Sequence, residues 1–245
     1  EGWVAGPAVS IETGFDLRTP EGQQKARKVV ELENPDLLVM AFPCSPWSQL
    51  QNWAKDQEKV RQKRKADVVF LKFAKEMSER QHSKGKRFLI ENPVASKAWS
   101  HPVLRDWISQ FDQVTVDMCA FGLKDPWSQK PFKKRTLLVT NSDVLARTFR
   151  SRKCCCEVPH EVINGSTWKL LPDGRWKATS RAQFAGGYTP EFARAILKEV
   201  RNDIEKGTYP IDLFQRQRQL HDMSETMPFL RPAKAPRLEL PVAPP

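Results

Sequence analysis

The sequence predicts an α/β fold in which buried strands alternate with helices around one parallel sheet. Short apolar runs, such as 37–42 and 87–90, have the length of single buried strands. The segments between them carry apolar residues at helical spacing, most clearly over 56–83. Strand–helix–strand units of this length are typical of parallel sheets with crossover helices.

Each element has a local justification. Thr19-Pro20 and Thr189-Pro190 each combine a capping threonine with a proline at the first helical position, and Gly85 is typical of a helix end. Pro172-Asp173-Gly174 predicts the turn of a hairpin. In chain order we expect strands at 8–12, 36–42, 87–91, 114–118 and 136–140, helices at 19–33, 56–83, 102–110, 141–148 and 189 to about 207, and a hairpin at 168–176.

The chain has 245 residues, which is long enough for one sizeable core. We expect an α/β domain at 1–208 with a small insert at about 142–182. Residues 209–245 are expected to form a Pro/Arg-rich tail or linker, disordered at its end, because the stretch from Met227 onward lacks periodicity. Because the first residue is Glu1 rather than methionine, we also expect the chain to be cut from something longer.

The charge of the chain indicates its partner. The net charge is +11, and the basic residues concentrate at Lys59–Lys65, Lys84–Arg87, Lys130–Arg135 and Arg147–Lys153. Ordinary surface lysine explains such a charge as well as a polyanionic partner does, but three of these runs flank the candidate site below. We therefore expect a monomer that binds nucleic acid. No apolar stretch approaches the length of a membrane span, so a membrane protein is not expected.

The cysteines indicate a reducing, intracellular environment. There are five of them, an odd number, and Cys154, Cys155 and Cys156 are contiguous, unlike a secreted disulfide framework. Contiguous cysteines cannot easily all bind one zinc ion, and no second pair of ligands follows them besides His160. We therefore expect no metal site, and we expect Cys119 to be a core residue.

Two strand ends deliver reactive side chains. Cys44 follows the strand expected at 36–42, and Glu91 ends the strand expected at 87–91. Ligands of open α/β sheets bind beyond the carboxyl ends of the strands, so a thiol and a carboxylate would share one crevice. Taken alone, Cys44 would be a small core residue and Glu91 a cap or surface acid. Together they favour a nucleophile with a neighbouring proton donor.

Four short elements support this interpretation by their order. Pro43-Cys44 has Ser48 four residues beyond the cysteine, and Glu91-Asn92 ends the next strand. Phe121-Gly122-Leu123 precedes basic residues at Lys133 and Arg135, and Ala185-Gly186-Gly187-Tyr188-Thr189-Pro190 precedes the last helix. In this order, over 8–204, the segments resemble the C5-cytosine methyltransferases of DNA. Pro93, Lys133 and Gly187 depart from that pattern, which indicates a remote branch similar to the methyltransferase-like segments of retroelement or phage polyproteins.

The resemblance implies a Rossmann-like S-adenosylmethionine-dependent methyltransferase sheet with a small insert. It implies that the Cys44 thiolate adds to C6 of a flipped cytosine, that Glu91 bonds N3 and the exocyclic amine, and that Arg135 bonds the ring carbonyl. Ser48, Asn92, Lys133 and Gly187 would contact the substrate, DNA rather than RNA. The Trp168/Trp176 hairpin lies where a target-recognition region would be, although a cross-strand aromatic pair covering the core is an equal alternative. Lys133 and Arg135 could also belong to a solvated basic loop.

The resemblance also implies S-adenosylmethionine as cofactor. Glu12 would hold the ribose, Asp16 the adenine amine, and Pro43 would contact the cofactor, although turn chemistry explains the two acids equally well. The family's Phe-x-Gly-x-Gly loop is absent, and 2–6 is no substitute. The alternative function is a catalytically degenerate nucleic-acid-binding domain of a mobile-element polyprotein. Either function implies an intracellular location, nuclear or associated with nucleic acid.

Overall fold

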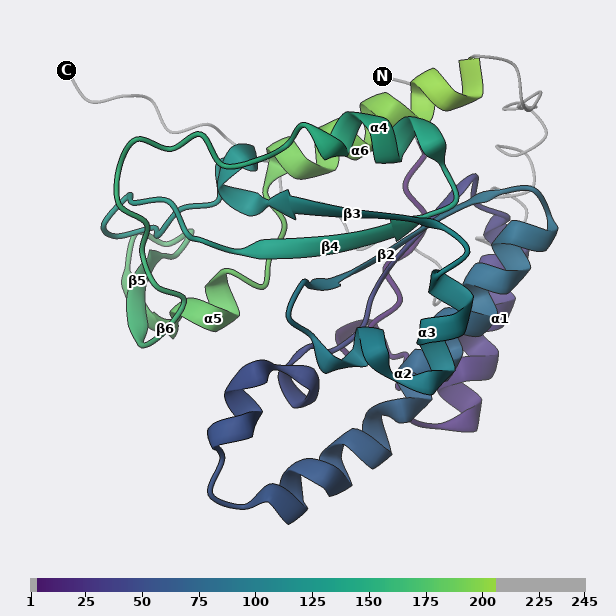
Figure 1. Cartoon of the computed structure of the whole chain (residues 1–245), viewed down its shortest axis with the longest axis horizontal. Coiled ribbons are helices and arrows are strands. Elements are labelled where there is room, and N and C mark those ends of the chain that lie inside the picture. Colours follow the sequence, from purple (N-terminus) through teal and green to yellow (C-terminus); the bar gives the residue numbers. More distant parts are fainter. Residues whose placement is uncertain (1–3, 206–245) are drawn as a thin grey trace.

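The computed structural model describes residues 4–205, which form a four-stranded sheet between two layers of helices, with a separate hairpin beside it (Figure 1). The sheet contains β1 (Leu37–Ala41), β2 (Arg87–Pro93), β3 (Asp112–Asp117) and β4 (Arg135–Thr140), and the hairpin contains β5 (Ser166–Leu170) and β6 (Trp176–Ser180). The helices are α1 (Pro20–Glu33), α2 (Gln57–Ser83), α3 (Pro102–Ile108), α4 (Asp143–Arg150), α5 (Arg181–Phe184) and α6 (Pro190–Asp203).

The sheet is mixed, so the expectation of a parallel sheet was wrong for one strand. The strand order is β1-β2-β4-β3; β1 and β2 are parallel, whereas β4 runs antiparallel to both of its neighbours. A parallel return from β3 to β4 would need a long crossover, usually helical. The connection instead contains a 3-10 turn, η5 (Met118–Phe121), and a loop closed by the Lys124–Pro131 bridge, so the chain reverses direction.

The predicted helices are confirmed within a few residues, and so are the threonine caps of α1 and α6; the cap of α2, Asp56, was not predicted. The side chains of Thr19, Asp56 and Thr189 accept hydrogen bonds from the first turns of α1, α2 and α6, respectively. The helix α6 ends at Asp203, and residues 204–205 continue it with π-helical backbone. The rest of the predicted extension to about 207 and the tail at 209–245 lie outside the described residues. No helix among residues 4–205 is long and apolar enough to cross a membrane.

The strand expected at 8–12 is absent, and that expectation is corrected. The segment forms a 3-10 turn, η1 (Ile11–Thr13), in which the Ser10 amide donates to Thr13 Oγ1 at 2.9 Å and Gly14 closes the turn at φ 88°. Polar side chains of this kind bond their own backbone and compete with strand pairing. In the described part of the chain β1 is therefore an edge strand, and its Val39 is 42% exposed.

Two apolar cores hold the layers together. On one face of the sheet, α4 and α6 pack on Leu89, Val116 and Leu138. On the other face, α2 and α3 pack on Phe88, Ile90 and Val139. The hairpin β5–β6 stands apart from both cores (Figure 1), and most of its side chains are exposed.

The hairpin is confirmed, but its tryptophans do not cover the core. Trp176 lies opposite Leu170 and Trp168 opposite Ala178, and both indoles are about half exposed. Trp176 instead contacts Trp127 edge to face, with ring centroids 5.1 Å apart.

Candidate active site at the ends of β1 and β2

The segment that follows β1 is tied to the end of β2. Asn92, a buried residue of β2, donates from Nδ2 to the carbonyl oxygen of Phe42 at 2.8 Å. Immediately beyond, Cys44 caps the 3-10 turn η2 (Ser45–Trp47), whose Trp47 amide bonds the Cys44 carbonyl at 3.0 Å. Because β1 and β2 are parallel neighbours with Ala41 opposite Glu91, both strand ends open on the same edge of the sheet.

Glu91 is a buried carboxylate with three neighbours of functional interest. Glu91 is 5% exposed, and its Oε2 accepts a hydrogen bond from the Tyr188 hydroxyl at 2.9 Å. Its Oε1 lies 3.8 Å from Lys134 Nζ. The third neighbour is Cys44, whose thiol is within electrostatic reach of both Glu91 and Lys134. The structure thus brings Cys44 and Glu91 into one site, with a lysine and a tyrosine beside them.

The electrostatics of the site are mixed. Desolvation by the surrounding chain raises the pKa of the Cys44 thiol, the Lys134 ammonium lowers it, and the Glu91 carboxylate raises it, with a net increase. Desolvation and the charge of Glu91 also raise the pKa of Tyr188 well above its usual range. Tyr188 therefore stays protonated and donates to Glu91, while Lys134 is the group that favours a Cys44 thiolate.

Buried polar atoms without hydrogen-bond partners gather around these strand ends. In the described chain they are Trp47 Nε1, Arg64 Nη2, Glu91 Oε1, Asn92 Oδ1 and Thr136 Oγ1. Arg64 belongs to the same region because its Nε donates to the Pro46 carbonyl at 2.8 Å, and Thr136 lies opposite Pro93 across β2 and β4. Buried polar groups are nearly always paired, so unpaired donors and acceptors near these strand ends, on both faces of the sheet, are candidate contacts for a polar ligand.

The structure places Arg135 and Lys133 away from this site. Arg135 lies opposite Asp117 in the ladder, and its Nε is 3.6 Å from Asp117 Oδ1. Glu91 lies opposite Leu138, and side chains alternate between the two faces of a strand. Lys134 therefore shares the face of Glu91, whereas Arg135 points to the other face and Lys133 is exposed.

The remaining predicted substrate residues have local roles. The Ser48 hydroxyl caps the 3-10 turn η3 (Gln49–Trp53) by accepting from the Leu50 amide. Gly187 lies in the turn between α5 and α6, directly before Tyr188, and its amide donates to the Phe184 carbonyl at 3.2 Å. Asn92 orients the cysteine segment through Phe42, as described above.

The residues predicted for the cofactor line one cavity. Glu12, Asp16 and Pro43 all border a cavity of about 340 Å³ between the 9–18 segment, β1 and α2. Its walls are mainly apolar, from Phe15, Phe70, Phe73, Met40 and Met77 among others. The Asp16 turn packs closely on α1 because Gly22 has no side chain. A Cβ at that position would lie 2.0 Å from the Asp16 carbonyl oxygen. Pro43 precedes Cys44, so this cavity adjoins the candidate nucleophile.

Three residues of the site escaped the sequence analysis. Tyr188 lay within the recognised 185–190 element, but nothing in its spacing indicated Glu91 as its partner. Lys134 stood between the two basic positions that were selected, and Arg64 was one of many cations in a charged helix. The signal that separates each of them from its neighbours is a contact with the site, to Glu91 for Tyr188 and Lys134 and to the Pro46 carbonyl for Arg64, and such contacts appear only in three dimensions.

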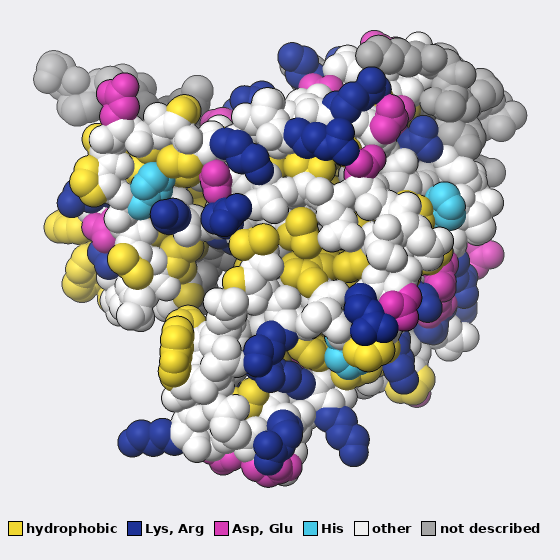
Figure 2. Space-filling view, viewed as in Figure 1, with side chains coloured by type: hydrophobic (Ala, Val, Ile, Leu, Met, Phe, Trp, Pro, Cys, Tyr) yellow, Lys and Arg dark blue, Asp and Glu magenta, His cyan; other side chains and the backbone are white. Residues whose placement is uncertain are grey.

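The surface around the site is basic and carries exposed aromatic rings. Lysine and arginine side chains spread over much of the face in Figure 2, with hydrophobic side chains between them. Trp53, beyond the cysteine turn, is 77% exposed, and Trp127 is 60% exposed. Comparisons of the chain with protein-family models, with curated proteins and with solved structures find no match.

Proposed function

We propose that the protein transfers a methyl group from S-adenosylmethionine to C5 of cytosine in DNA through a covalent adduct with Cys44. The observation that carries the proposal is the shared site of Cys44 and Glu91, with Lys134 and Tyr188 as neighbours and with unpaired buried polar atoms around them. A mixed sheet with helices on both faces, in which three of the four strands run in the same direction, is compatible with the Rossmann-like fold that the sequence resemblance implies.

The residues of the chain would act on the base in a defined order. The Cys44 thiolate forms a bond to C6 and displaces an electron pair toward C5, while Glu91 bonds N3 and the exocyclic amine. Lys134, rather than Arg135, offsets the negative charge of the thiolate and of Glu91. After C5 has gained its methyl group, C5 loses its proton to solvent, the S–C6 bond breaks, and Cys44 is released as thiolate.

The cavity beside β1 fits the proposed methyl donor. Carboxylates such as Glu12 and Asp16 can accept hydrogen bonds from ribose hydroxyls and an amine, and apolar walls suit an adenine ring. S-adenosylmethionine would supply an electrophilic methyl group there. No glycine lines this cavity among the described residues, so the close backbone approach of the family's glycine loop has no counterpart in it.

Exposed tryptophans among basic residues favour nucleic acid as the substrate. Trp53, Trp127, Trp168 and Trp176 are all at least 46% exposed. Bases stack on such rings while lysine and arginine neutralise the phosphates. The same surface would serve the alternative function, a non-catalytic nucleic-acid-binding domain of a mobile-element polyprotein.

Covalent trapping on DNA that contains 5-fluorocytosine tests the proposal, because fluorine at C5 prevents release of the cysteine. The chain, with any upstream sequence of its gene retained, should form an adduct in the presence of S-adenosylmethionine. Cys44→Ala should form none, and Cys155→Ala, a change at another exposed cysteine, should keep it. Binding of DNA without any adduct from the unmodified protein would reject methyl transfer and support the alternative.

A further inference from the structure

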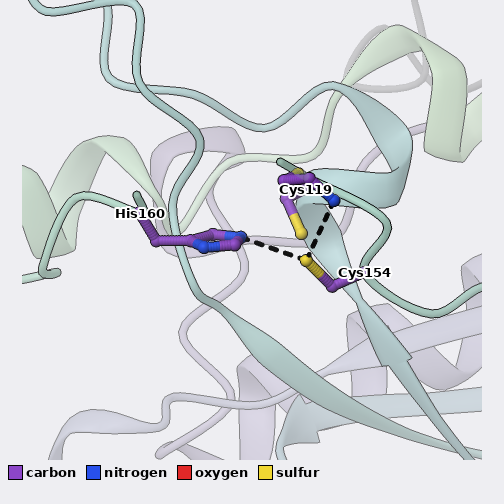
Figure 3. Close-up of side chains that lie close together, drawn as sticks. Cys119, Cys154 and His160 are labelled. Carbon is purple, nitrogen blue, oxygen red and sulfur yellow. Dashed lines mark hydrogen bonds between the residues drawn. The ribbon is translucent and has the colours of Figure 1, made fainter. Parts of the chain in front are cut away.

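Three cysteines and a histidine converge at the start of the β3–β4 connection. Cys119 comes from η5, Cys154 and Cys156 follow α4, and His160 precedes the hairpin. One ligand atom from each lies within 4.8 Å of the other three. Figure 3 shows the imidazole of His160 directed at Cys154 Sγ, which is 3.2 Å from Nε2, with the Cys119 sulfur next to the Cys154 sulfur.

These separations suit a tetrahedral metal ion. Zinc binds cysteine sulfur at about 2.3 Å and histidine nitrogen at about 2.0–2.1 Å, so its ligand atoms lie roughly 3.5–3.8 Å apart. The observed limit of 4.8 Å and the Cys154–His160 distance of 3.2 Å bracket that range. Small side-chain rotations are thus enough to bring the four atoms around one ion.

The segment that carries three of these ligands is held by isolated contacts rather than by regular secondary structure. Residues 151–165 form no helix and join no named strand, and most of them are exposed. The isolated contacts include hydrogen bonds from Asp117 N–H to the Arg152 carbonyl, from Cys154 N–H to Asp117 Oδ2 and from Glu161 N–H to the Pro131 carbonyl. Arg181 also pairs with Glu161. Long connections without secondary structure are uncommon in compact domains. A metal ion is a common cross-link where a core is lacking.

We propose that Cys119, Cys154, Cys156 and His160 bind one structural Zn²⁺. Four protein ligands close the coordination shell and leave no position for water or substrate, which is the pattern of structural rather than catalytic zinc. Thiolate and imidazole ligands are the ones that zinc favours. The Cys156 amide also lies 3.5 Å from Cys154 Sγ as a donor, an arrangement that stabilises a metal-bound thiolate.

A disulfide accounts for these residues less well than zinc does. A bond between two of the three cysteines would leave the third thiol and His160 without a role in the cluster. The expectation of no metal site rested on two points, the contiguous cysteines and the lack of a second pair of ligands nearby in the sequence. Cys155 is exposed and lies outside the cluster, so only alternate cysteines are needed, and Cys119 supplies the ligand that the local sequence lacks.

The zinc site would fix the position of the neighbouring hairpin, and this structural role does not depend on whether the protein transfers methyl groups. The zinc would fasten 154–160 to η5, and Glu161 then pairs with the 131–132 segment that leads to Lys134. The cross-link therefore joins the start of the hairpin segment to the β3–β4 connection.

Zinc content of the full chain, purified with a non-thiol reductant and without added metal, tests the proposal. We expect about one zinc per chain in the unmodified protein. The zinc content should be at least about tenfold lower in Cys119→Ser, Cys156→Ser and His160→Ala. Cys155→Ser is the matched control and should keep its zinc. Equal loss of zinc from Cys155→Ser and Cys156→Ser would overturn the assignment. So would a Cys119–Cys154 disulfide that persists in protein purified with the reductant.

Cobalt substitution keeps the proposal testable if the ligand variants do not fold. Unmodified protein stripped of zinc and titrated with Co²⁺ should show thiolate-to-cobalt charge transfer and the strong visible bands of a tetrahedral site. Added Zn²⁺ should abolish both. The absence of zinc as purified, together with the absence of a tetrahedral cobalt spectrum, would reject the site.

Discussion

The Tyr188 hydroxyl donates a hydrogen bond to Glu91 Oε2 at 2.9 Å, although the two residues are 97 positions apart in the chain. The bond joins the turn before α6 to the end of β2. It engages one carboxylate oxygen and leaves Oε1 next to Lys134, buried and without a hydrogen bond. Glu91 is therefore oriented with one oxygen available to a ligand.

Replacement of Tyr188 by phenylalanine should weaken both stability and catalysis. Loss of a hydrogen bond to a buried charged group is expected to lower the free energy of unfolding by about 1–3 kcal/mol. Urea unfolding measures this change, and adduct formation on 5-fluorocytosine DNA measures the loss of orientation. Trp53→Phe, at a side chain that is 77% exposed, should change neither stability nor folding cooperativity.

The Tyr188 contribution should depend on pH in one direction. The pKa of Tyr188 is raised in the folded protein, so the unfolded chain loses this proton first, near pH 10. The stabilisation is fully present below that pH and falls as the pH rises. The difference in stability between the unmodified protein and Tyr188→Phe should accordingly shrink above pH 10; a constant difference would contradict the buried hydrogen bond.

Lys134 and Glu91 should shift the reactivity of Cys44 in opposite directions. The Lys134 charge lowers the pKa of the thiol and the Glu91 charge raises it. At pH 8, Lys134→Met should slow alkylation of Cys44 by iodoacetamide, and Glu91→Gln should accelerate it, each by a factor on the order of three. Mass spectrometry of the Cys44 peptide separates this thiol from the other four.

Arg135→Met is the matched control for Lys134→Met. Arg135 is the next residue along the chain, but it pairs with Asp117 on the other face of the sheet. It should leave the alkylation rate of Cys44 unchanged. If Arg135→Met changed the alkylation rate as much as Lys134→Met, the net charge of the surface would control the pKa of the Cys44 thiol, and the specific position of Lys134 would not.

Asn92→Ala should loosen the cysteine segment. The substitution removes the donor to the Phe42 carbonyl and leaves that oxygen unpaired, at a cost of about 1–3 kcal/mol in unfolding free energy. Adduct formation should fall more than stability predicts, because the bond positions the residues just before Cys44. Asn52→Ala, at an exposed position, should stay within about 0.5 kcal/mol of the unmodified protein. If Asn92→Ala and Asn52→Ala lost adduct formation equally, Asn92 would have no positioning role.

Asp125 should anchor the hairpin through its charge. Burial raises its pKa, but hydrogen bonds from the Ser128 and Trp127 amides, Thr167 and Arg181 lower it by more, so the net pKa lies below the usual value. Asp125→Asn leaves Arg181 with Glu161, 3.5 Å away, as its remaining carboxylate partner, and weakens the charge-assisted hydrogen bonds to Asp125, so it should cost about 1–3 kcal/mol.

The lowered pKa of Asp125 predicts how its contribution to stability changes in acid. A lowered folded pKa means that the stabilisation is present above the unfolded value, about 3.9, and is lost as the pH falls below it. Asp125→Asn should therefore unfold with less dependence on pH between 4 and 2 than the unmodified protein does. Asp106→Asn, at an exposed carboxylate paired only with Arg105, should behave like the unmodified protein in urea.

Much of the fold could be predicted because its signals are local. The capping threonines of α1 and α6 and the apolar spacing of α2 act within a few residues, so the sequence located these helices closely. The 8–12 segment failed because its alternation of residues resembled a strand, whereas its own side chains close a turn. Strand formation depends on a partner strand, and the described chain offers none there.

The sequence was enough to place Cys44 just beyond one strand and Glu91 near the end of the next, because each hydrophobic run and the polar residues that follow it are local features of the chain. The tertiary structure decided which residues join them. The antiparallel register of β4 turns Lys134 toward Glu91 and Arg135 away from it, since a shift of one residue exchanges the two faces of a strand. Likewise, Tyr188 meets Glu91, and Cys119 meets Cys154, only because packing brings together positions that no local pattern connects.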